Sequence, residues 1–234
     1  LEELRTFMDI GEGTIEESET EDKDWINNWK EFFHQFYVDD ILIVPSWEEV
    51  KEEDKDKMIL HIDPGTAFGT GMHETTQLVI RQLKKYVTRG AEILDVGTGS
   101  GILGITALKL GAGHVVGTDL DPCAVSAVQD NKEANQIEDD SFDMMIGNII
   151  DDVEVQNEVG YERYDIVAAN ILADVLVPLT PVIVHQMKKG AYYITSGILD
   201  VKEEVVREAV EKAGLTLVEV TKQGEWVCVT ARKD

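Results

Sequence analysis

The stretch "ILDVGTGSGILG" carries the residues whose chemistry is easiest to interpret in this chain of 234 residues. Gly97, Gly99 and Gly101 follow a continuous apolar run, and glycines there let the backbone turn tightly and approach a ligand without a Cβ in the way. Asp119 ends the next apolar segment, "HVVGTD", where a carboxylate can accept hydrogen bonds from both hydroxyls of a ribose. The spacing predicts cofactor binding by Gly97, Gly99 and Asp119. The plainer alternative is a glycine turn without a ligand.

A second polar position lies in "VAANILAD". Asn170 follows an apolar run there and offers a carbonyl acceptor, and the backbone carbonyls of Ile171 and Leu172 offer more. Such acceptors can orient an attacking amine, which must be neutral to act as a nucleophile. We therefore consider Asn170 and Leu172 as catalytic residues. The alternative role for Asn170 is to cap a helix that starts near Leu172.

The surrounding pattern predicts the elements that position these residues. Apolar runs alternate with amphipathic segments, which is typical of a doubly wound, mostly parallel sheet. The short "TKQGE" near the end predicts a terminal hairpin and thus an antiparallel last strand. The expected strands are 92–96, 114–118, 142–146, 164–169, 191–196, 215–220 and 225–231. The expected helices are 74–87, 101–111, 122–136, 172–187 and 201–213.

The part before this sheet divides into two segments. Residues 1–20 have too little apolar surface to form a domain alone. In residues 21–63, "EDKDWINNWKEFFHQF" predicts an amphipathic helix, because its aromatic residues follow a helical spacing. The apolar runs within 41–63, separated by a charged turn, predict a hairpin.

The segment "HIDPGTAFGTGMHETT" precedes the expected helix at 74–87. His61 and His73 raise the possibility of a metal site, but no third ligand has suitable spacing, so we expect no metal. Phe68 is a candidate to cover a bound cofactor, with core packing as the alternative. Asp63 can help to place an amine or, more simply, cap the end of the hairpin. The glycines suit a loop that folds over a ligand.

Composition limits the classes of partner. The formal net charge of −25 argues against a phosphate-tracking nucleic-acid groove. It favours a basic partner, and solubility or a generally acidic proteome is the alternative explanation. Cys123, expected to be a buried helix residue, and Cys228 lie far apart without a CxxC pair, so a reducing cytoplasm is the default. No apolar run approaches the roughly 18 residues of a membrane helix. Nothing indicates the oligomeric state, and we favour a monomer.

Several features together resemble the class I methyltransferases, which bind S-adenosylmethionine. Asp95 stands before the glycine loop, "DLDP" follows the acidic strand, and the terminal strand pair suits a seven-stranded sheet with a reversed last strand. By the same resemblance, Asn148 and Ile149 follow the third strand, where such enzymes often meet the adenine ring. The "GSGILG" match to GxGxxG leaves a nicotinamide-dependent oxidoreductase as a weaker alternative.

Four motifs make the resemblance more specific: "DPGTAFGTGMHETT", "LDVGTGSGILGITALKLGA", "GTDLDPCAV" and "NILADVL". They resemble the bacterial methyltransferases of large-subunit ribosomal protein eleven, over roughly residues 22–234. The resemblance implies cofactor contacts at Thr76, Gly97, Asp119 and Asn170. The sequence departs from the usual pattern at Met72 and Glu74, and we expect both changes to be tolerated.

The resemblance also implies an activity and a domain plan. Members of this family methylate lysine side chains and an N-terminal amine of the ribosomal protein, a basic substrate. The plan is a remnant of a substrate-recognition domain at 1–20, a linker helix and hairpin at 21–63, and the methyltransferase domain at 64–234. The remaining alternative is a class I methyltransferase acting on a nucleic-acid base or small molecule.

Overall fold

The computed structural model describes residues 33–63, 69 and 71–234. The chain divides into two compact units, Leu1–His34 and Gln35–Asp234, and the second contains the fold described below. Most of the expected linker helix, as well as Phe68, lies outside the described residues. No helix is present at residues 33–35, and a strand begins at Phe36.

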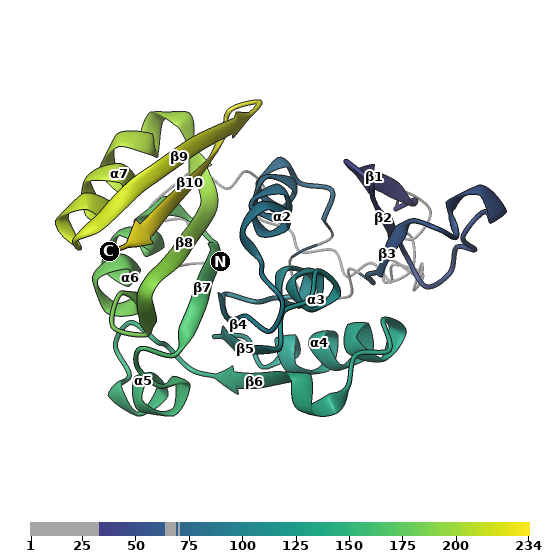
Figure 1. The fold of residues 1–234 in the computed structure, drawn as a ribbon, viewed down its shortest axis with the longest axis horizontal. Coiled ribbons are helices and arrows are strands. Elements are labelled where there is room, and N and C mark those ends of the chain that lie inside the picture. The colour runs from purple at the N-terminus through teal and green to yellow at the C-terminus, as the bar shows by residue number, and fades with distance from the viewer. Residues whose placement is uncertain (1–32, 64–68, 70) are drawn as a thin grey trace, which may run out of the picture. The chain divides into compact units, whose positions relative to one another are not determined.

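A seven-stranded sheet forms the centre of the second unit, in the order β6-β5-β4-β7-β8-β10-β9 (Figure 1). Adjacent strands from β6 through β8 are parallel, whereas β10 pairs antiparallel with both β8 and β9. The expected mostly parallel sheet with an antiparallel last strand is confirmed. The strands are β4 (Glu92–Val96), β5 (His114–Asp119), β6 (Phe142–Ile146), β7 (Tyr164–Asn170), β8 (Met187–Leu199), β9 (Leu215–Gln223) and β10 (Trp226–Lys233).

Helices cover both faces of this sheet, so the core has two layers. One apolar cluster joins the sheet to α2 (Glu74–Tyr86), α3 (Ile102–Lys109) and α4 (Cys123–Ala134). The other joins it to α5 (Val153–Val159), α6 (Ala173–Ile183) and α7 (Glu203–Lys212). The central strands are buried from both sides, which explains why they are continuous apolar runs.

The sequence pattern did not predict α5. This helix has seven residues, little apolar surface and a start set by Asp152, whose side chain accepts hydrogen bonds from the N–H groups of Glu154 and Val155. Too few turns are present for a helical period to emerge from the acidic segment. The other helices begin and end close to the expected positions, although α6 is shorter and β8 longer than expected.

The predicted hairpin at 41–63 is wrong. β2 (Ile41–Val44) pairs in parallel with β3 (Met58–His61), and β2 instead forms its hairpin with β1 (Phe36–Val38). The charged segment 45–57, which includes the 3-10 turn Glu52–Asp54, is long enough to carry the chain back to the start of a parallel strand. Asp63 closes this small sheet by accepting hydrogen bonds from the Ser46 N–H and hydroxyl, at 2.7 and 2.6 Å. The expected capping role of Asp63 matches this geometry.

Candidate functional site

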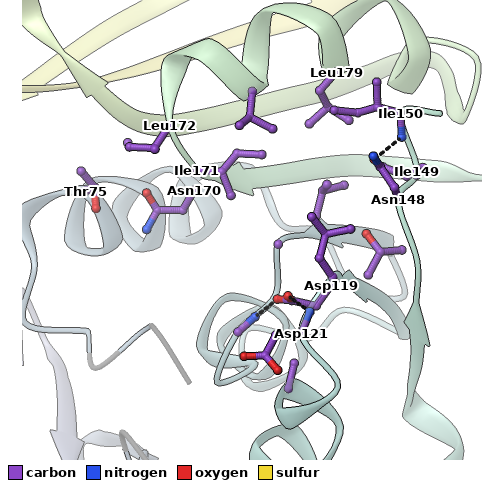
Figure 2. A pocket seen from close by; sticks show the side chains of 18 of the residues that line it. Thr75, Asp119, Asp121, Asn148, Ile149, Ile150, Asn170, Ile171, Leu172 and Leu179 are labelled. Atoms are coloured by element: carbon purple, nitrogen blue, oxygen red, sulfur yellow. Dashed lines mark hydrogen bonds between the residues drawn. The ribbon is translucent and has the colours of Figure 1, made fainter. Parts of the chain in front are cut away.

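A cavity of about 610 Å³ opens at the carboxyl ends of the parallel strands (Figure 2). Ligands bind at this edge in open α/β sheets, because loops from several strands converge there. The walls come from five strands, from the loops after β4, β5, β6 and β7, and from α2, α4 and α6. The residues that line it are His73, Thr75, Val96, Gly97, Gly99, Thr118, Asp119, Leu120, Asp121, Ala124, Gly147, Asn148, Ile149, Ile150, Asn170, Ile171, Leu172, Val175, Leu179, Gly197 and Trp226.

The glycine loop forms one wall. Gly97, Gly99 and Gly101 have φ angles of 71°, 53° and 80°, in the left-handed region that favours glycine. The Gly97 N–H donates to the Thr118 carbonyl at 2.8 Å, which ties the loop to the end of β5. The backbone thus exposes a surface without side chains between β4 and α3, as the sequence predicts.

The Asp95 side chain, at the end of β4, binds the glycine loop and the start of α3 by hydrogen bonds. This side chain is fully buried, and one carboxylate oxygen accepts hydrogen bonds from the Thr98 hydroxyl at 2.8 Å and the Gly104 N–H at 3.1 Å. Burial raises the pKa of Asp95 to about 6, although these two hydrogen bonds oppose the rise. The other oxygen, Oδ1, has no hydrogen-bond partner among the described residues.

Asp119 stands at the end of β5, beside the loop. Its Oδ2 accepts a hydrogen bond from the Gly99 N–H at 2.8 Å, and its Oδ1 accepts one from the Asp121 N–H at 2.9 Å. These bonds fix the carboxylate in the cavity wall (Figure 2). Each oxygen of a carboxylate can accept more than one hydrogen bond, so the group keeps capacity for two hydroxyls.

Asn148 and Ile149 line the cavity after β6, where the sequence places them. The Asn148 side chain is used locally: its Oδ1 accepts from the Ile150 N–H at 3.0 Å and its Nδ2 donates to Asp151 at 3.0 Å. Asn148 thus holds the turn, while the buried Ile149 and its neighbour Ile150 supply apolar surface. This arrangement suits a flat ring against the wall.

Asn170 lies at the end of β7 between the glycine loop and the start of α2. Its Nδ2 donates a hydrogen bond to the Thr76 hydroxyl at 3.1 Å. Its Oδ1 is buried and has no hydrogen-bond partner among the described residues. The side chain makes no cap for α6, whose N-cap residue is Leu172. An unpaired buried acceptor is costly, and its place at the cavity makes Oδ1 a candidate to accept a hydrogen bond from a ligand.

Leu172 is placed differently from Asn170. Its carbonyl accepts hydrogen bonds from the Val175 and Leu176 N–H groups at 2.9 and 3.0 Å, which starts α6. That oxygen is therefore engaged by the helix, and the exposed Leu172 side chain lies at the cavity instead. Of the two candidate catalytic residues, only Asn170 presents an unpaired acceptor.

The Asn170–Leu172 segment depends on a glycine that the sequence did not single out. Gly197, in β8, has a φ of 85°, and a Cβ there would overlap the Ile171 carbonyl oxygen and lie 2.7 Å from its carbon. The Ile171 N–H donates to the neighbouring Ser196 carbonyl at 3.2 Å. Gly197 therefore lets the Asn170–Leu172 segment lie directly against the sheet.

Thr76 does not line the cavity. It is buried in the first turn of α2 and contacts Asn170, whereas its neighbours Thr75 and His73 form part of the wall. His73 is also the N-cap of α2, and its Nδ1 accepts from the Thr75 N–H at 3.3 Å. His61 is not a lining residue, and Cys123 is exposed rather than buried because it begins α4 on the outer side.

Trp226 was missed because nothing in the local pattern marks it. Trp226 is the first residue of β10, and it reaches the cavity only because β10 pairs with β8. His73 was considered only as a metal ligand, and Thr75, in the same motif, was not singled out. In the described part of the chain, no three His, Cys, Asp or Glu side chains come together as metal ligands do. Among the described helices, none combines the length and apolarity needed to cross a bilayer.

Comparison with known proteins adds to this geometry. The profile of the family "Ribosomal protein L11 methyltransferase (PrmA)" matches residues 1–234. A ribosomal protein L11 methyltransferase of Agathobacter rectalis is 57% identical over all of this chain and 73% of its own length. That of Lachnospira eligens is 59% identical, over all of this chain and 74% of its own length.

A solved structure leads to the same family. The crystal structure of a ribosomal protein L11 methylase from Lactobacillus delbrueckii subsp. bulgaricus has a TM-score of 0.77 and 31% identity. The matched region covers 86% of this chain and 100% of the solved chain. The seven-stranded, mostly parallel sheet with an antiparallel last strand is that of class I methyltransferases, as the sequence predicted. The chain belongs to the ribosomal protein L11 methyltransferase family.

Proposed function

We propose that this protein transfers methyl groups from S-adenosylmethionine to lysine side-chain and N-terminal amines of ribosomal protein L11. The observation that carries this proposal is the position of Asn170. Asn170 lines the same cavity as the glycine loop and Asp119, and its buried Oδ1 has no hydrogen-bond partner among the described residues. An acceptor for an amine and a cradle for a nucleoside cofactor thus belong to the same site.

The residues of the cavity fit the cofactor. Asp119 keeps lone pairs for the ribose hydroxyls, and Ile149 and Ile150 supply an apolar wall for the adenine ring. Gly97 and Gly99 leave room for the methionine part near the loop backbone, because no Cβ projects there. When bound, S-adenosylmethionine supplies a methyl group already activated by a sulfonium.

The protein then has to position and desolvate the acceptor amine. Asn170 Oδ1 can accept a hydrogen bond from the neutral amine and aim its lone pair, which contributes through orientation. The Thr76 hydroxyl fixes which end of the Asn170 carboxamide takes this role, because it binds Nδ2. The mostly apolar wall favours the neutral form of the amine over the ammonium.

The choice of substrate is supported by charge and by the relatives. The net charge of −25 suits a basic ribosomal protein and disfavours binding along a phosphate backbone. The relatives from Agathobacter rectalis and Lachnospira eligens both carry the name of an L11 methyltransferase. We therefore prefer a protein amine over a nucleic-acid base as the acceptor.

Transfer of a radiolabelled methyl group to recombinant L11 tests the proposal. Labelling of L11 is expected, and labelling of RNA without L11 would replace the protein acceptor with a nucleic acid. Thermal shift measurements should show stabilisation by S-adenosylmethionine and not by NAD. Stabilisation by NAD alone would contradict the assignment of the cofactor.

Asp119→Ala tests the cofactor half of the site. We expect its S-adenosylmethionine affinity to fall by roughly 1–3 kcal/mol, because charge-assisted hydrogen bonds to the ribose are lost. Asp174→Ala is a matched control, since it removes the same charge from an exposed position paired with Lys202. Isothermal titration calorimetry measures both, and equal affinity in the two variants would remove Asp119 from the site.

A further inference from the structure

The lining residues follow the order of the strands across the cavity. Asn148 and Ile149 follow β6, Asp119 ends β5, and Gly97 follows β4. Asn170 comes next, at the end of β7, because β7 pairs with β4. All the residues that fit the cofactor therefore lie on one side of Asn170, toward β6.

The cavity continues on the other side of Asn170. Gly197 lines it from β8, and Trp226 lines it from the first position of β10, where it pairs with Leu199. His73 and Thr75 line it from the start of α2. This end of the cavity, which we call the acceptor end, contains an indole and an imidazole, and no carboxylate lines it among the described residues.

The two rings at the acceptor end hold each other in place. The His73 and Trp226 ring centroids lie 4.8 Å apart, with an angle of 68° between the planes, which is an edge-to-face arrangement. His73 is itself fixed, because its Nδ1 lies 2.8 Å from the Thr75 hydroxyl and 3.3 Å from the N–H of the same residue. Trp226 also packs on the core beneath α2. His73 and Trp226 are therefore held in place before a substrate binds.

We propose that Trp226, held by His73, contacts the side chain of the acceptor lysine and so selects a long, cationic amine. The inference rests on the proposed function and identifies the part of the same cavity that receives the protein substrate. An indole ring binds an alkyl chain by apolar contact and an ammonium through its π face. Methyl transfer to an amine leaves positive charge on nitrogen until a proton departs to solvent, and the same ring favours that charge.

Binding of the acceptor lysine uses both the apolar surface of the Trp226 indole and its attraction for a cation. The lysine arrives as an ammonium and must lose its proton before it attacks. A π face attracts the cation during entry without pairing it with a carboxylate, which would hold it in the charged form. Asn170 Oδ1 then accepts from the neutral amine. Trp226 thus acts on substrate recognition, and Asn170 acts on the reacting nitrogen.

Trp226→Leu and Trp226→Phe test this assignment, with KM for L11 and Kd for S-adenosylmethionine measured separately. We expect Trp226→Leu to raise the KM for L11 about tenfold and to leave the cofactor Kd unchanged. Trp226→Phe should retain most of the wild-type KM, because an aromatic face remains. Since Trp226 also packs on the core, the melting temperature of each variant is measured, and Trp226→Phe keeps the test valid if the leucine variant fails to fold.

Leu120→Ala is the matched variant from the opposite end of the cavity, where Leu120 follows Asp119. We expect the reverse pattern there: a weaker cofactor Kd and an unchanged KM for L11. An unchanged KM in Trp226→Leu, or equal losses of cofactor and L11 affinity, would overturn the assignment of Trp226. Failure of the wild-type protein to label L11 would instead overturn the proposed function, so the two failures are distinguishable.

Discussion

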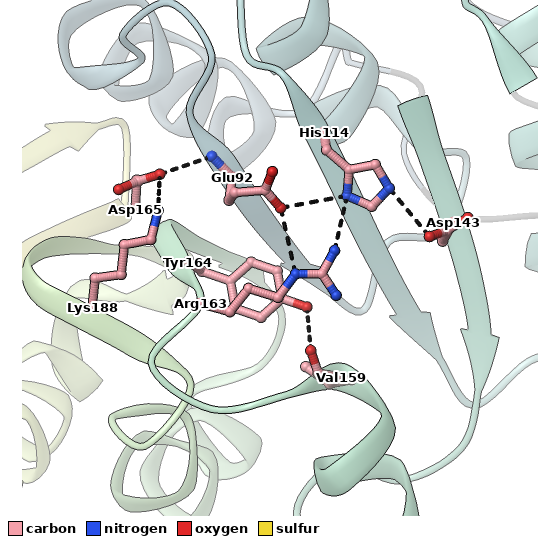
Figure 3. Close-up of polar contacts among 8 residues, drawn as sticks. All are labelled: Glu92, His114, Asp143, Val159, Arg163, Tyr164, Asp165 and Lys188. Carbon is pink, nitrogen blue, oxygen red and sulfur yellow. Dashed lines mark hydrogen bonds and ion pairs between the residues drawn. The ribbon is translucent and has the colours of Figure 1, made fainter. Parts of the chain in front are cut away.

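The amino and carboxyl ends of the parallel strands differ in the contacts that their polar side chains make. At the amino end, charged side chains from neighbouring strands pair with one another (Figure 3). Lys188 Nζ lies 2.8 Å from Asp165, which also accepts from the Glu92 N–H at 2.9 Å. His114 Nε2 lies 3.1 Å from Asp143. These contacts join β4 through β8 at the edge opposite the cavity.

At the carboxyl end, the side chains of Asp119 and Asn148 bond locally, and two further acceptors beside them are left unpaired. Asn170 Oδ1 and Asp95 Oδ1 are both buried and without a hydrogen-bond partner among the described residues. The amino end also has an unpaired buried side chain among these residues, that of Gln186. Such groups reduce stability unless a ligand or another donor completes them. The amino end therefore carries the ion pairs between strands, while the carboxyl end carries the cavity, where ligands bind in open α/β sheets.

The largest effect is expected from Gly197→Ala, which alters the carboxyl end directly. The new Cβ would overlap the Ile171 carbonyl and displace the segment that carries Asn170. A shift of about 1 Å in a catalytic group can cost on the order of 100-fold in rate. We expect a loss of L11 methylation of that order, measured as kcat, together with a lower melting temperature.

Gly190→Ala is the matched control for that variant. Gly190 lies in the same strand with a similar φ of 83°, but nothing lies within 4 Å of its Cβ position. It therefore carries the cost of the left-handed backbone, roughly 1–2 kcal/mol, without the overlap. Equal losses of kcat in the two variants would show that backbone strain, and not the Ile171 contact, explains the effect.

The next largest effect is expected from Thr76→Val, which removes the partner of Asn170 Nδ2 and keeps the shape of the side chain. The carboxamide then has an unpaired donor, at a cost of about 1–3 kcal/mol, and loses the contact that fixes its orientation. We expect kcat to fall roughly tenfold, since 1.4 kcal/mol corresponds to that factor. The KM for L11 should change less.

Thr76→Ser provides the rescue for this prediction, because it restores the hydroxyl. A variant that merely loosened the packing of α2 would not recover kcat with serine. If Thr76→Ser and Thr76→Val had the same kcat, Thr76 would not position Asn170.

The difference between the two ends also explains what the sequence could predict. Gly97, Gly99 and Asp119 are recognisable because their roles follow from local spacing around one strand–loop–helix unit. Gly197 and Trp226 are not, because their roles depend on β8 pairing with β7 and β10 pairing with β8. The partner of Thr76 likewise comes from a distant strand. The parallel pairing of β2 with β3 was missed for the same reason, since strand direction depends on the path of the connection.

A smaller effect is expected from the pH dependence of stability, through Asp95. Its pKa is raised to about 6 by burial, so between about pH 4 and 6 the folded state binds more protons than the unfolded state. The free energy of unfolding should therefore fall as the pH rises through this window, by at most about 3 kcal/mol. Chemical denaturation at several pH values measures the slope.

Asp95→Asn isolates this contribution. Asparagine can still accept from Thr98 and Gly104 but does not titrate, so its stability should be flatter between pH 4 and 6 than that of the wild type. The slope is the informative quantity, because the new amide N–H₂ group also meets an unpaired position. An identical slope in both proteins would mean that Asp95 is not the group that titrates.

The smallest effect is expected from Lys188→Met at the amino end. The variant keeps an alkyl chain but loses the ion pair to Asp165. The Lys188 side chain is 40% exposed and the Asp165 side chain 38%. Pairs of this exposure contribute at most about 1 kcal/mol. Lys212→Met, which removes an exposed pair within α7, gives the baseline for a contact that joins no strands. We expect Lys188→Met to be slightly less stable than Lys212→Met and both to methylate L11 at the wild-type rate. A reduced kcat in Lys188→Met alone would contradict the division of roles, because it would mean that the amino-end pairs help to position Asn170 through β7 and β8.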